Sequence, residues 1–295
     1  MFLSGSSCRT QAIEIAKRPL SGRKMRLTVP RRANELAMGE CPDVRSVCAI
    51  AVMAKASIAG KTKTRLVPPL TEDEAAMVNT VFLRDAADNI LSAAAFASIS
   101  GWMAYAPAGS KPFFKTHLPE SIGLIETVAP TLGECLLHAA STLLRAGHGA
   151  VCLINSDSPT LPTGYLVTAA TALAAPGDRV VLGPSTDGGY YLIGMKRPHP
   201  HLFEDIAWST DRVLSQTMAR AEALGLPVFQ LPTWYDVDDA ETLQVLIHEM
   251  LDGQPFRHVG TPTPATWTRR HLSKLVQEFG LQGRVRGSRA VSGLP

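Results

Sequence analysis

The stretch Asp187-Gly188-Gly189-Tyr190-Tyr191 lies between two short apolar runs, residues 179–184 and 192–194. Both runs are rich in branched or aromatic residues and end at Gly or Pro, which is typical of β-strands. Between them the chain reverses through one carboxylate and two glycines, whose backbone can approach a ligand because no Cβ intervenes. The plainer interpretation is a hairpin turn, since Asp-Gly is a common hairpin dipeptide. In either case we expect an antiparallel pair of strands here.

Apolar runs of strand length alternate with segments of helical periodicity over residues 47–251. Thr71 and Glu74 have the spacing of a capping box, which marks the start of the first helix. This alternation predicts an α/β sandwich with a mostly parallel sheet, whose ligands lie beyond the carboxyl ends of the strands. Further strands are expected at 47–54, 98–106, 150–154 and 227–231, and helices at 75–91, 132–146, 163–175, 209–224 and 240–251.

Composition excludes some classes of protein and divides the chain. A net charge of +3 on 295 residues is too small to indicate a nucleic-acid partner. No apolar run approaches the ~18 residues that a membrane span needs, so a soluble protein is expected. Residues 1–45 begin with an Arg-rich, acid-poor segment and are predicted to be a disordered N-terminal extension. We expect the folded domain at 46–252, and a polar tail at 253–295 with one weak helix at 267–279.

The cysteines and histidines show no metal-binding pattern. The five cysteines include no CxxC pair, and the eight histidines have no paired spacing. Cys48 and Cys152 lie within strand-like runs, which indicates reduced thiols buried in the core of a cytoplasmic protein.

A basic loop directly follows the first predicted strand. Residues 55–65 combine small residues with three lysines and one arginine, a composition that suits an anionic phosphate ligand. We take Lys55, Gly60, Lys63 and Arg65 as candidate phosphate-binding residues. A solvated basic loop is the alternative. The resemblance to an ATPase P-loop fails, because the first glycine of that motif would fall on Lys55.

Acidic residues follow two other predicted strands. Asp157 comes just after the strand at 150–154, and Asp236 and Asp238 follow the strand at 227–231. In an extended segment, alternate residues point to the same side. Carboxylates are the ligands that hard cations prefer, so these residues are candidates for holding Mg²⁺ or Mn²⁺. Helix caps or turns are the alternative, and Asp238 or Asp239 would then cap the last helix.

A set of collinear motifs resembles a known family. It is similar to the GT-A superfamily domain-of-unknown-function proteins named rSAM/selenodomain-associated transferases, over about residues 47–250. The resemblance implies a single Rossmann-like GT-A domain, a nucleotide-diphospho-sugar transferase fold that binds a nucleotide and a divalent metal. The motifs are Lys55, Gly60, Lys63-Thr64-Arg65-Leu66, Phe82-Leu83-Arg84-Asp85, Leu132-Gly133-Glu134, Ser156-Asp157-Ser158-Pro159, Gly183-Pro184, residues 187–194, Phe203, Trp208-Ser209-Thr210 and Asp236-Val237-Asp238.

The chain also departs from the family pattern. Cys135 stands where the family usually has Arg, and Asp239-Ala240 stands where it usually has Thr-Pro. The carboxylates at 157, 187, 236 and 238 are kept, which favours an active protein.

The resemblance implies a metal-dependent transferase, most simply a glycosyltransferase that moves a sugar from a nucleotide-diphospho-sugar to a small acceptor. In that hypothesis the metal acids, Asp157 above all, neutralise the leaving nucleoside diphosphate. Asp187, with Gly188 and Gly189, faces the sugar or the acceptor and acts as a base or binds hydroxyls. Tyr190 and Trp208 are the other candidate substrate-binding residues, and a core tryptophan is the alternative for the latter.

Two other functions remain open at this point. A nucleotidyltransferase, similar to guanylyltransferases, would use the same parts and release pyrophosphate. A catalytically silent nucleotide-binding module would have the same fold but no transferase activity.

Overall fold

The computed structural model describes residues 46–254, 256 and 260–285, all within the compact unit Cys41–Pro295. The extension predicted for residues 1–45 lies outside the described residues. In the described part, no helix has both the length and the apolar character that crossing a membrane requires. The cytoplasmic location expected from the cysteines stays a prediction.

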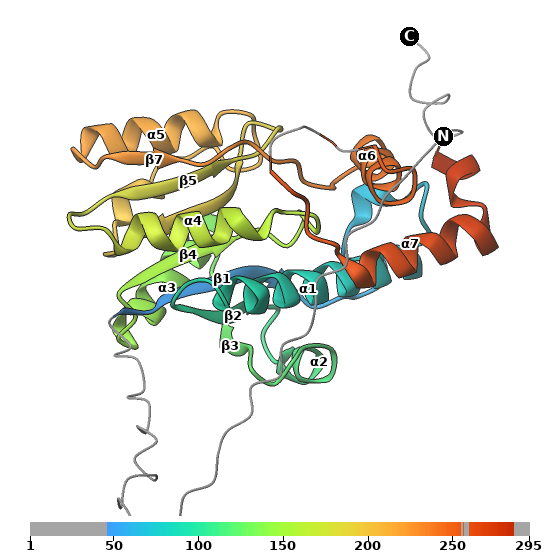
Figure 1. Cartoon of the computed structure of the whole chain (residues 1–295), viewed down its shortest axis with the longest axis horizontal. Helices are drawn as coiled ribbons and strands as arrows, with labels where there is room; N and C mark the ends of the chain where they lie inside the picture. The colour runs from blue at the N-terminus through green and yellow to red at the C-terminus, as the bar shows by residue number, and fades with distance from the viewer. Residues whose placement is uncertain (1–45, 255, 257–259, 286–295) are drawn as a thin grey trace, which may run out of the picture. The chain divides into compact units, whose positions relative to one another are not determined.

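A seven-stranded sheet forms the centre of the fold (Figure 1). Its strand order is β3-β2-β1-β4-β6-β5-β7, and every neighbouring pair is parallel except the two that involve β6. The predicted antiparallel pair around residue 187 is therefore β5 and β6. The strands are β1 Cys48–Lys55, β2 Ile99–Ala106, β3 Gly123–Glu126, β4 Ala150–Ile154, β5 Val180–Pro184, β6 Tyr190–Met195 and β7 Val228–Gln230.

Helices cover both faces of the sheet, as the alternation predicted. Buried side chains of α1, α4, α6 and α7 share one core, and those of α3 and α5 belong to the core on the other face. The helices are α1 Glu72–Ala94, α2 Lys111–His117, α3 Leu132–Arg145, α4 Thr163–Ala174, α5 Val213–Ala223, α6 Ala240–Leu251 and α7 Thr266–Phe279, with 3-10 turns at Thr64–Leu66 and Pro200–Leu202.

The sequence of the central strand β1 is an unbroken apolar run because both faces of this strand are buried. Ile50 and Val52 are buried in the core on one face, while Ala49 and Ala51 are buried in the core on the other. A strand covered on both faces has no polar side to alternate with. Cys48 and Cys152 are free thiols with their sulfurs 3.8 Å apart, as expected for reduced core cysteines.

Two elements were absent from the sequence prediction. The short edge strand β3 begins at Gly123, where an added Cβ would lie 2.3 Å from the ring of Trp102 on the neighbouring strand β2. With four half-buried or exposed residues, β3 has no apolar alternation to detect. The seven-residue helix α2 is the second.

Helix α5 begins at Val213 rather than at residue 209, because Ser209 adopts a left-handed φ of 63° that ends any continuous helix there. At the start of α6, Asp239 is the N-cap and accepts a hydrogen bond from the Thr242 amide, as one of the alternatives for this segment had it.

The chain order of the strands creates a switch point between β1 and β4. From β1 the chain proceeds to β2 and β3 on one side, and it then returns to place β4 on the other side. Connections at such a point diverge, which leaves a crevice at the carboxyl ends of the two strands. The loops that begin at Lys55 and Asn155 both open onto this crevice.

The segment after residue 260 packs against α1. Figure 1 shows α7 running beside α1, and Asp85 of α1 accepts hydrogen bonds from the Trp267 amide (3.0 Å) and the Thr268 amide (2.7 Å). A carboxylate of one helix therefore caps the first turn of another. Further along, Arg284 pairs with Glu74 at 2.8 Å and donates to the Pro69 carbonyl at 3.0 Å.

Replacing Asp85 tests this cap. Asp85 is 3% exposed, so Asp85→Ala leaves two backbone N–H groups without acceptors and is expected to lower the free energy of unfolding by about 1–3 kcal/mol. Asp88→Ala is the matched control, because it removes one hydrogen bond from the Trp267 indole and is expected to cost less than about 1 kcal/mol. Urea unfolding measures both, and equal losses would contradict the cap.

Candidate functional site

Four loops meet at the carboxyl edge of the sheet. They follow β1 (residues 56–65), β4 (155–159), β5 (185–189) and β7 (231–238). Because β6 is antiparallel, the turn between β5 and β6 lies at the same edge as the ends of the parallel strands. The candidate residues predicted from the sequence lie in or beside these loops, except Trp208, which lies in the segment before α5.

The loop after β1 is held by α1 and by its own side chains. Asn79 of α1, 2% exposed, donates to the Lys55 carbonyl at 3.0 Å and to the Ser57 hydroxyl at 2.9 Å. Within the loop, the Thr62 hydroxyl accepts from the Ile58 amide at 3.0 Å. The backbone is thus fixed by neutral groups, which leaves the basic side chains of the loop free to face the crevice.

Lys63 joins the basic loop to the acidic loops. Its side chain is 6% exposed, and its Nζ lies 2.8 Å from Oδ1 of Asp157 and 3.4 Å from Oδ1 of Asp238. It also donates to the Val237 carbonyl at 2.6 Å. Arg65, which is largely exposed, reaches Oδ2 of Asp238 at 3.3 Å. The structure therefore brings together the basic loop, Asp157 and Asp238, three parts that are far apart in the sequence.

The segment that carries Asp236 and Asp238 is fixed by the buried residues around it. Trp234 and Tyr235 are almost fully buried, and the Tyr235 hydroxyl donates to Glu249 of α6 at 2.5 Å. The Val237 amide donates to the Asp157 carbonyl at 2.8 Å, which ties this segment to the loop after β4. The two carboxylates flank buried Val237, and both line the crevice.

The carboxylates disfavour one another's ionisation. Burial raises the pKa of Asp236 to about 7, with further contributions from the charges of Asp187, Asp238 and Asp157. Burial also raises the pKa of Asp238, although Lys63 acts in the opposite direction. A cluster of this kind is stabilised by added positive charge, whether from a lysine or from a cation.

The donor atoms fit a hard divalent cation. Within the described part of the chain, no three His, Cys, Asp or Glu side chains are placed so that together they could hold a metal ion. Mg²⁺ is commonly held by only one or two carboxylates, with substrate phosphates and waters completing the shell. The oxygen atoms of Asp157, Asp236 and Asp238 meet that requirement, and the metal stays a prediction.

The crevice has two connected cavities. The smaller, about 280 Å³, lies against the basic loop, and the larger, about 610 Å³, extends toward the turn between β5 and β6. Four charged residues line both cavities and mark the boundary between them: Lys55, Arg65, Asp157 and Asp238.

The turn between β5 and β6 positions a carboxylate and a neighbouring segment. Asp187 accepts a hydrogen bond from the Gly189 amide at 2.8 Å, and both residues line the larger cavity. Gly188 has a φ of 88°, and a Cβ there would lie 2.2 Å from the Asp211 carbonyl oxygen. Gly188 lines neither described cavity, so its position serves the close approach of the chain at Asp211.

Gly60 is likewise outside both cavities. Its φ is 71°, and an added Cβ would lie 3.0 Å from the carboxylate of Glu72 in the first turn of α1. Tyr190 and Trp208 do line the larger cavity. Trp208 is half-buried and packs against Gly133 of α3, where a Cβ would approach its ring to 2.9 Å. This tryptophan is therefore both packed on one side and open to the cavity on the other.

The sequence interpretation missed several lining residues. Ser185, Asp211 and Asn155 line the larger cavity, and Asn79 and Lys61 line the smaller one. Asp211 directly follows the motif at 208–210, which was the available signal for it.

Cys135 lines neither cavity. The thiol faces the carbonyls of Thr127 and Ala129 at 3.9 Å, so this departure from the family pattern lies away from the two cavities.

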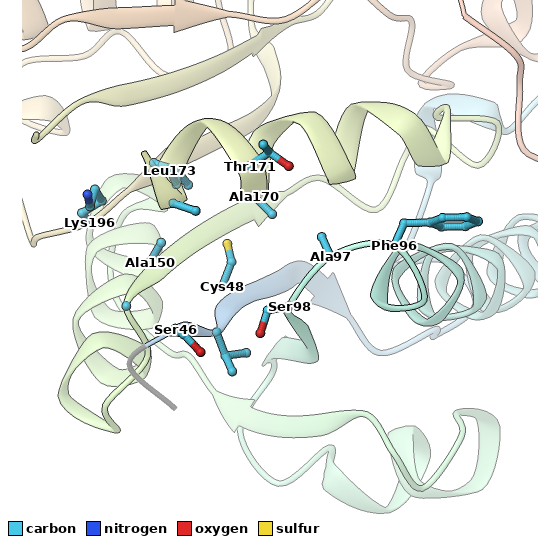
Figure 2. A pocket seen from close by; sticks show the side chains of 13 residues that line it. Ser46, Cys48, Phe96, Ala97, Ser98, Ala150, Ala170, Thr171, Leu173 and Lys196 are labelled. Atoms are coloured by element: carbon cyan, nitrogen blue, oxygen red, sulfur yellow. The ribbon is translucent and has the colours of Figure 1, made fainter. Parts of the chain in front are cut away.

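A separate cavity of about 430 Å³ lies at the opposite end of the strands (Figure 2). Cys48 and Ala150, at the amino ends of β1 and β4, contribute to it. Its basic residue is Lys196, whose ammonium already donates to the Ala175 and Gly177 carbonyls. Because none of the described residues that line it is a carboxylate, this cavity lacks the opposed charges of the carboxyl-edge crevice.

Comparisons with known proteins agree with the fold and the family resemblance. Residues 89–210 match the family model DUF2064, described as an uncharacterized protein conserved in bacteria. The chain is 28% identical to a Desulfovibrio desulfuricans G20 protein that has been proposed to be a nucleotide-diphospho-sugar transferase. That likeness covers 81% of this chain and 97% of the other, with a TM-score of 0.68. The resemblance drawn from the motifs and the Rossmann-like α/β fold are both confirmed.

Two further solved structures are more distant. A CMP:2-keto-3-deoxy-manno-octonic acid synthetase complexed with CTP is 12% identical over 70% of this chain and 100% of the other, with a TM-score of 0.45. A cytidylyltransferase from Leptospira borgpetersenii serovar Hardjo-bovis is 10% identical over 79% and 95%, with a TM-score of 0.44. The comparison with curated proteins gave no significant match.

Removing the Lys63 charge tests the ion pairs. Lys63→Met leaves Asp157 and Asp238 facing each other without a buried cation, so the free energy of unfolding is expected to fall by about 1–3 kcal/mol, less than for a fully buried pair because both acids are partly exposed. Arg65→Met is the control and is expected to cost under about 1 kcal/mol, since Arg65 is largely exposed. Urea unfolding in EDTA measures both; a Lys63 loss no larger than the Arg65 loss would refute the assignment.

Stability should depend on pH through Asp236. Its pKa is about 7 in the folded protein and near 3.8 in the unfolded chain, so the folded state holds this proton more tightly. The associated stability is complete below about pH 4 and is lost as the pH rises through 7, by a few kcal/mol at ~1.4 kcal/mol per pKa unit. In EDTA, the unfolding free energy of Asp236→Asn should fall less than that of the wild type between pH 5 and 8. Parallel curves would contradict the raised pKa, and Asp205→Asn serves as the exposed control.

Proposed function

We propose that the protein is a metal-dependent glycosyltransferase that moves a sugar from a nucleotide-diphospho-sugar to a small acceptor. The observation that carries this proposal is the meeting of Lys63 with Asp157 and Asp238 at the switch point of the sheet. Opposed cations and carboxylates at that place suit a diphosphate and a divalent cation together. The 28% identical protein from Desulfovibrio desulfuricans G20 has had the same class of activity proposed for it, which supports ours.

The smaller cavity is where the diphosphate of the donor would bind. Three lysines, Lys55, Lys61 and Lys63, and Arg65 line it. Arg65 is a planar donor suited to two phosphate oxygens, and the lysines are compact point charges. As the bond to the sugar breaks, negative charge grows on the departing diphosphate, and these fixed cations stabilise it without rearranging.

Asp157 and Asp238, with Asp236 nearby, would hold the Mg²⁺ or Mn²⁺. When bound, the cation supplies a Lewis acid that neutralises charge on the leaving diphosphate. In the structure, Lys63 supplies part of the positive charge that balances these acids, since its ammonium contacts both Asp157 and Asp238. Donor binding would therefore turn this lysine from the acids toward the phosphates.

The larger cavity would hold the sugar and the acceptor. Asp187 is exposed there, fixed by the Gly189 amide, and would accept the proton of the attacking hydroxyl. Trp208 would stack on a sugar ring with its open face. Tyr190 lines the same cavity and would contribute to its shape.

A turnover assay tests the proposal. The protein is incubated with Mn²⁺, a panel of nucleotide-diphospho-sugars and small acceptors, and the released product is identified. We expect nucleoside diphosphate, and we expect Asp157→Asn to lower its rate of release at least 100-fold. Asp205→Asn is the matched control, because Asp205 is exposed, pairs with Arg220 and lines neither cavity; it should retain the wild-type rate.

Other outcomes would identify the alternatives. Release of pyrophosphate from a nucleoside triphosphate would make the protein a nucleotidyltransferase. Nucleotide binding without turnover, unchanged by EDTA and by Asp157→Asn, would make it a silent binding module. An active preparation in which Asp157→Asn retains full turnover would refute the metal assignment alone.

A further inference from the structure

The two cavities of the crevice differ in charge. The smaller has four cationic side chains and two carboxylates. The larger has five carboxylates, and its two cations are Lys55 and Arg65, which also line the smaller cavity. Asp187, Asp211 and Asp236 line the larger cavity alone. The crevice is therefore basic at one end and acidic at the other.

We propose that the larger cavity binds a cyclic, hydroxylated acceptor that carries no phosphate or carboxylate group. This inference rests on the proposed function and names the class of its acceptor. Two features support it: the charge of the cavity and the apolar residues in its lining.

The charge disfavours an anionic acceptor. An acceptor bearing a phosphate would bring negative charge next to Asp187 and Asp211, which line the larger cavity alone and are not among the residues proposed to hold the cation. Like charges in a partly enclosed site repel strongly because little solvent screens them. Carboxylates accept hydrogen bonds but cannot donate them, so they favour a ligand that offers O–H groups.

Part of the lining is apolar and aromatic. Met53, Leu132, Leu136 and Trp208 line the larger cavity, and Leu132 is 47% exposed although it is a large apolar residue. Trp208 packs against Gly133, where an added Cβ would lie 2.9 Å from its ring. A cyclic ligand that presents C–H groups on one face and hydroxyls at its edge matches a cavity lined by both apolar residues and carboxylates.

The transfer step balances for such an acceptor. The acceptor oxygen forms a bond to the anomeric carbon of the donor sugar while the bond from that carbon to the diphosphate oxygen breaks. The hydroxyl proton passes to Asp187, and the electron pair of the broken bond leaves with the nucleoside diphosphate. No oxidant or further reactant is needed.

Matched pairs of ligands test the inference by saturation-transfer NMR on the full chain with Mg²⁺. The pairs are myo-inositol and its monophosphate, and glucose and glucose 6-phosphate, with inorganic pyrophosphate in excess to fill the smaller cavity. We expect a neutral member to bind at least 10-fold more tightly than its phosphate, and Trp208→Ala to weaken that binding at least 10-fold. Phe96→Ala is the control, because Phe96 is 76% exposed and lines only the cavity in Figure 2.

Charge-neutral variants separate the acidic residues from the apolar part of the lining. The double variant Asp187→Asn, Asp211→Asn should reduce the difference in binding affinity between each neutral ligand and its phosphate. The inference is overturned if a phosphate binds more tightly than its neutral partner in a Trp208-dependent manner, or if no ligand of the panel depends on Trp208.

The two proposals fail in different ways. Pyrophosphate release in the turnover assay, with neutral ligands bound at Trp208, would overturn glycosyl transfer and leave the acceptor class standing. Release of nucleoside diphosphate together with a preference for a phosphorylated acceptor would support glycosyl transfer and overturn the acceptor class.

Discussion

The rest of the site depends on the contact of one ammonium group with two carboxylates. Lys63 is nearly inaccessible to solvent, and its neighbours Asp157 and Asp238 follow the central strand β4 and the edge strand β7. Without a cation between them, these acids would repel each other across loops that the hydrogen bond from the Val237 amide to the Asp157 carbonyl holds together. Even with Lys63 in place, burial keeps the pKa of Asp238 raised, so one lysine does not fully offset burial together with the charge of Asp157. A further positive charge at this edge of the sheet would therefore stabilise the ionised carboxylates.

The topology of the sheet explains why these charged residues meet at this edge. Parallel strands direct their following loops to one edge, and the switch between β1 and β4 opens that edge to a ligand. The reversed strand β6 adds the turn at Asp187 to the same edge. Neutral side chains such as Asn79 and buried ones such as Trp234 fix the backbone, so the charged groups need not hold the loops themselves.

The sequence was sufficient for the features that local pattern encodes. The apolar run of β1, the turn at 187–189 and the capping box at Thr71 all rest on spacings of a few residues, and the structure has each of them. Features that depend on contacts between distant segments were beyond it. Gly188 is required by the backbone of Asp211, and Gly60 faces Glu72 rather than a ligand. No short-range pattern encodes these relations.

The cap that Asp85 places on α7 has a consequence for how the chain is made. Helix α1 leaves the ribosome about 180 residues before its partner, since the two capping bonds join positions 182 and 183 apart. Until then Asp85 lacks the amides of Trp267 and Thr268 as hydrogen-bond donors, and Glu74 lacks its ion-pair partner Arg284. During synthesis, α1 therefore makes these contacts only after α7 has been translated. Any truncation or fusion near residue 266 therefore acts on a helix about 180 positions earlier in the chain.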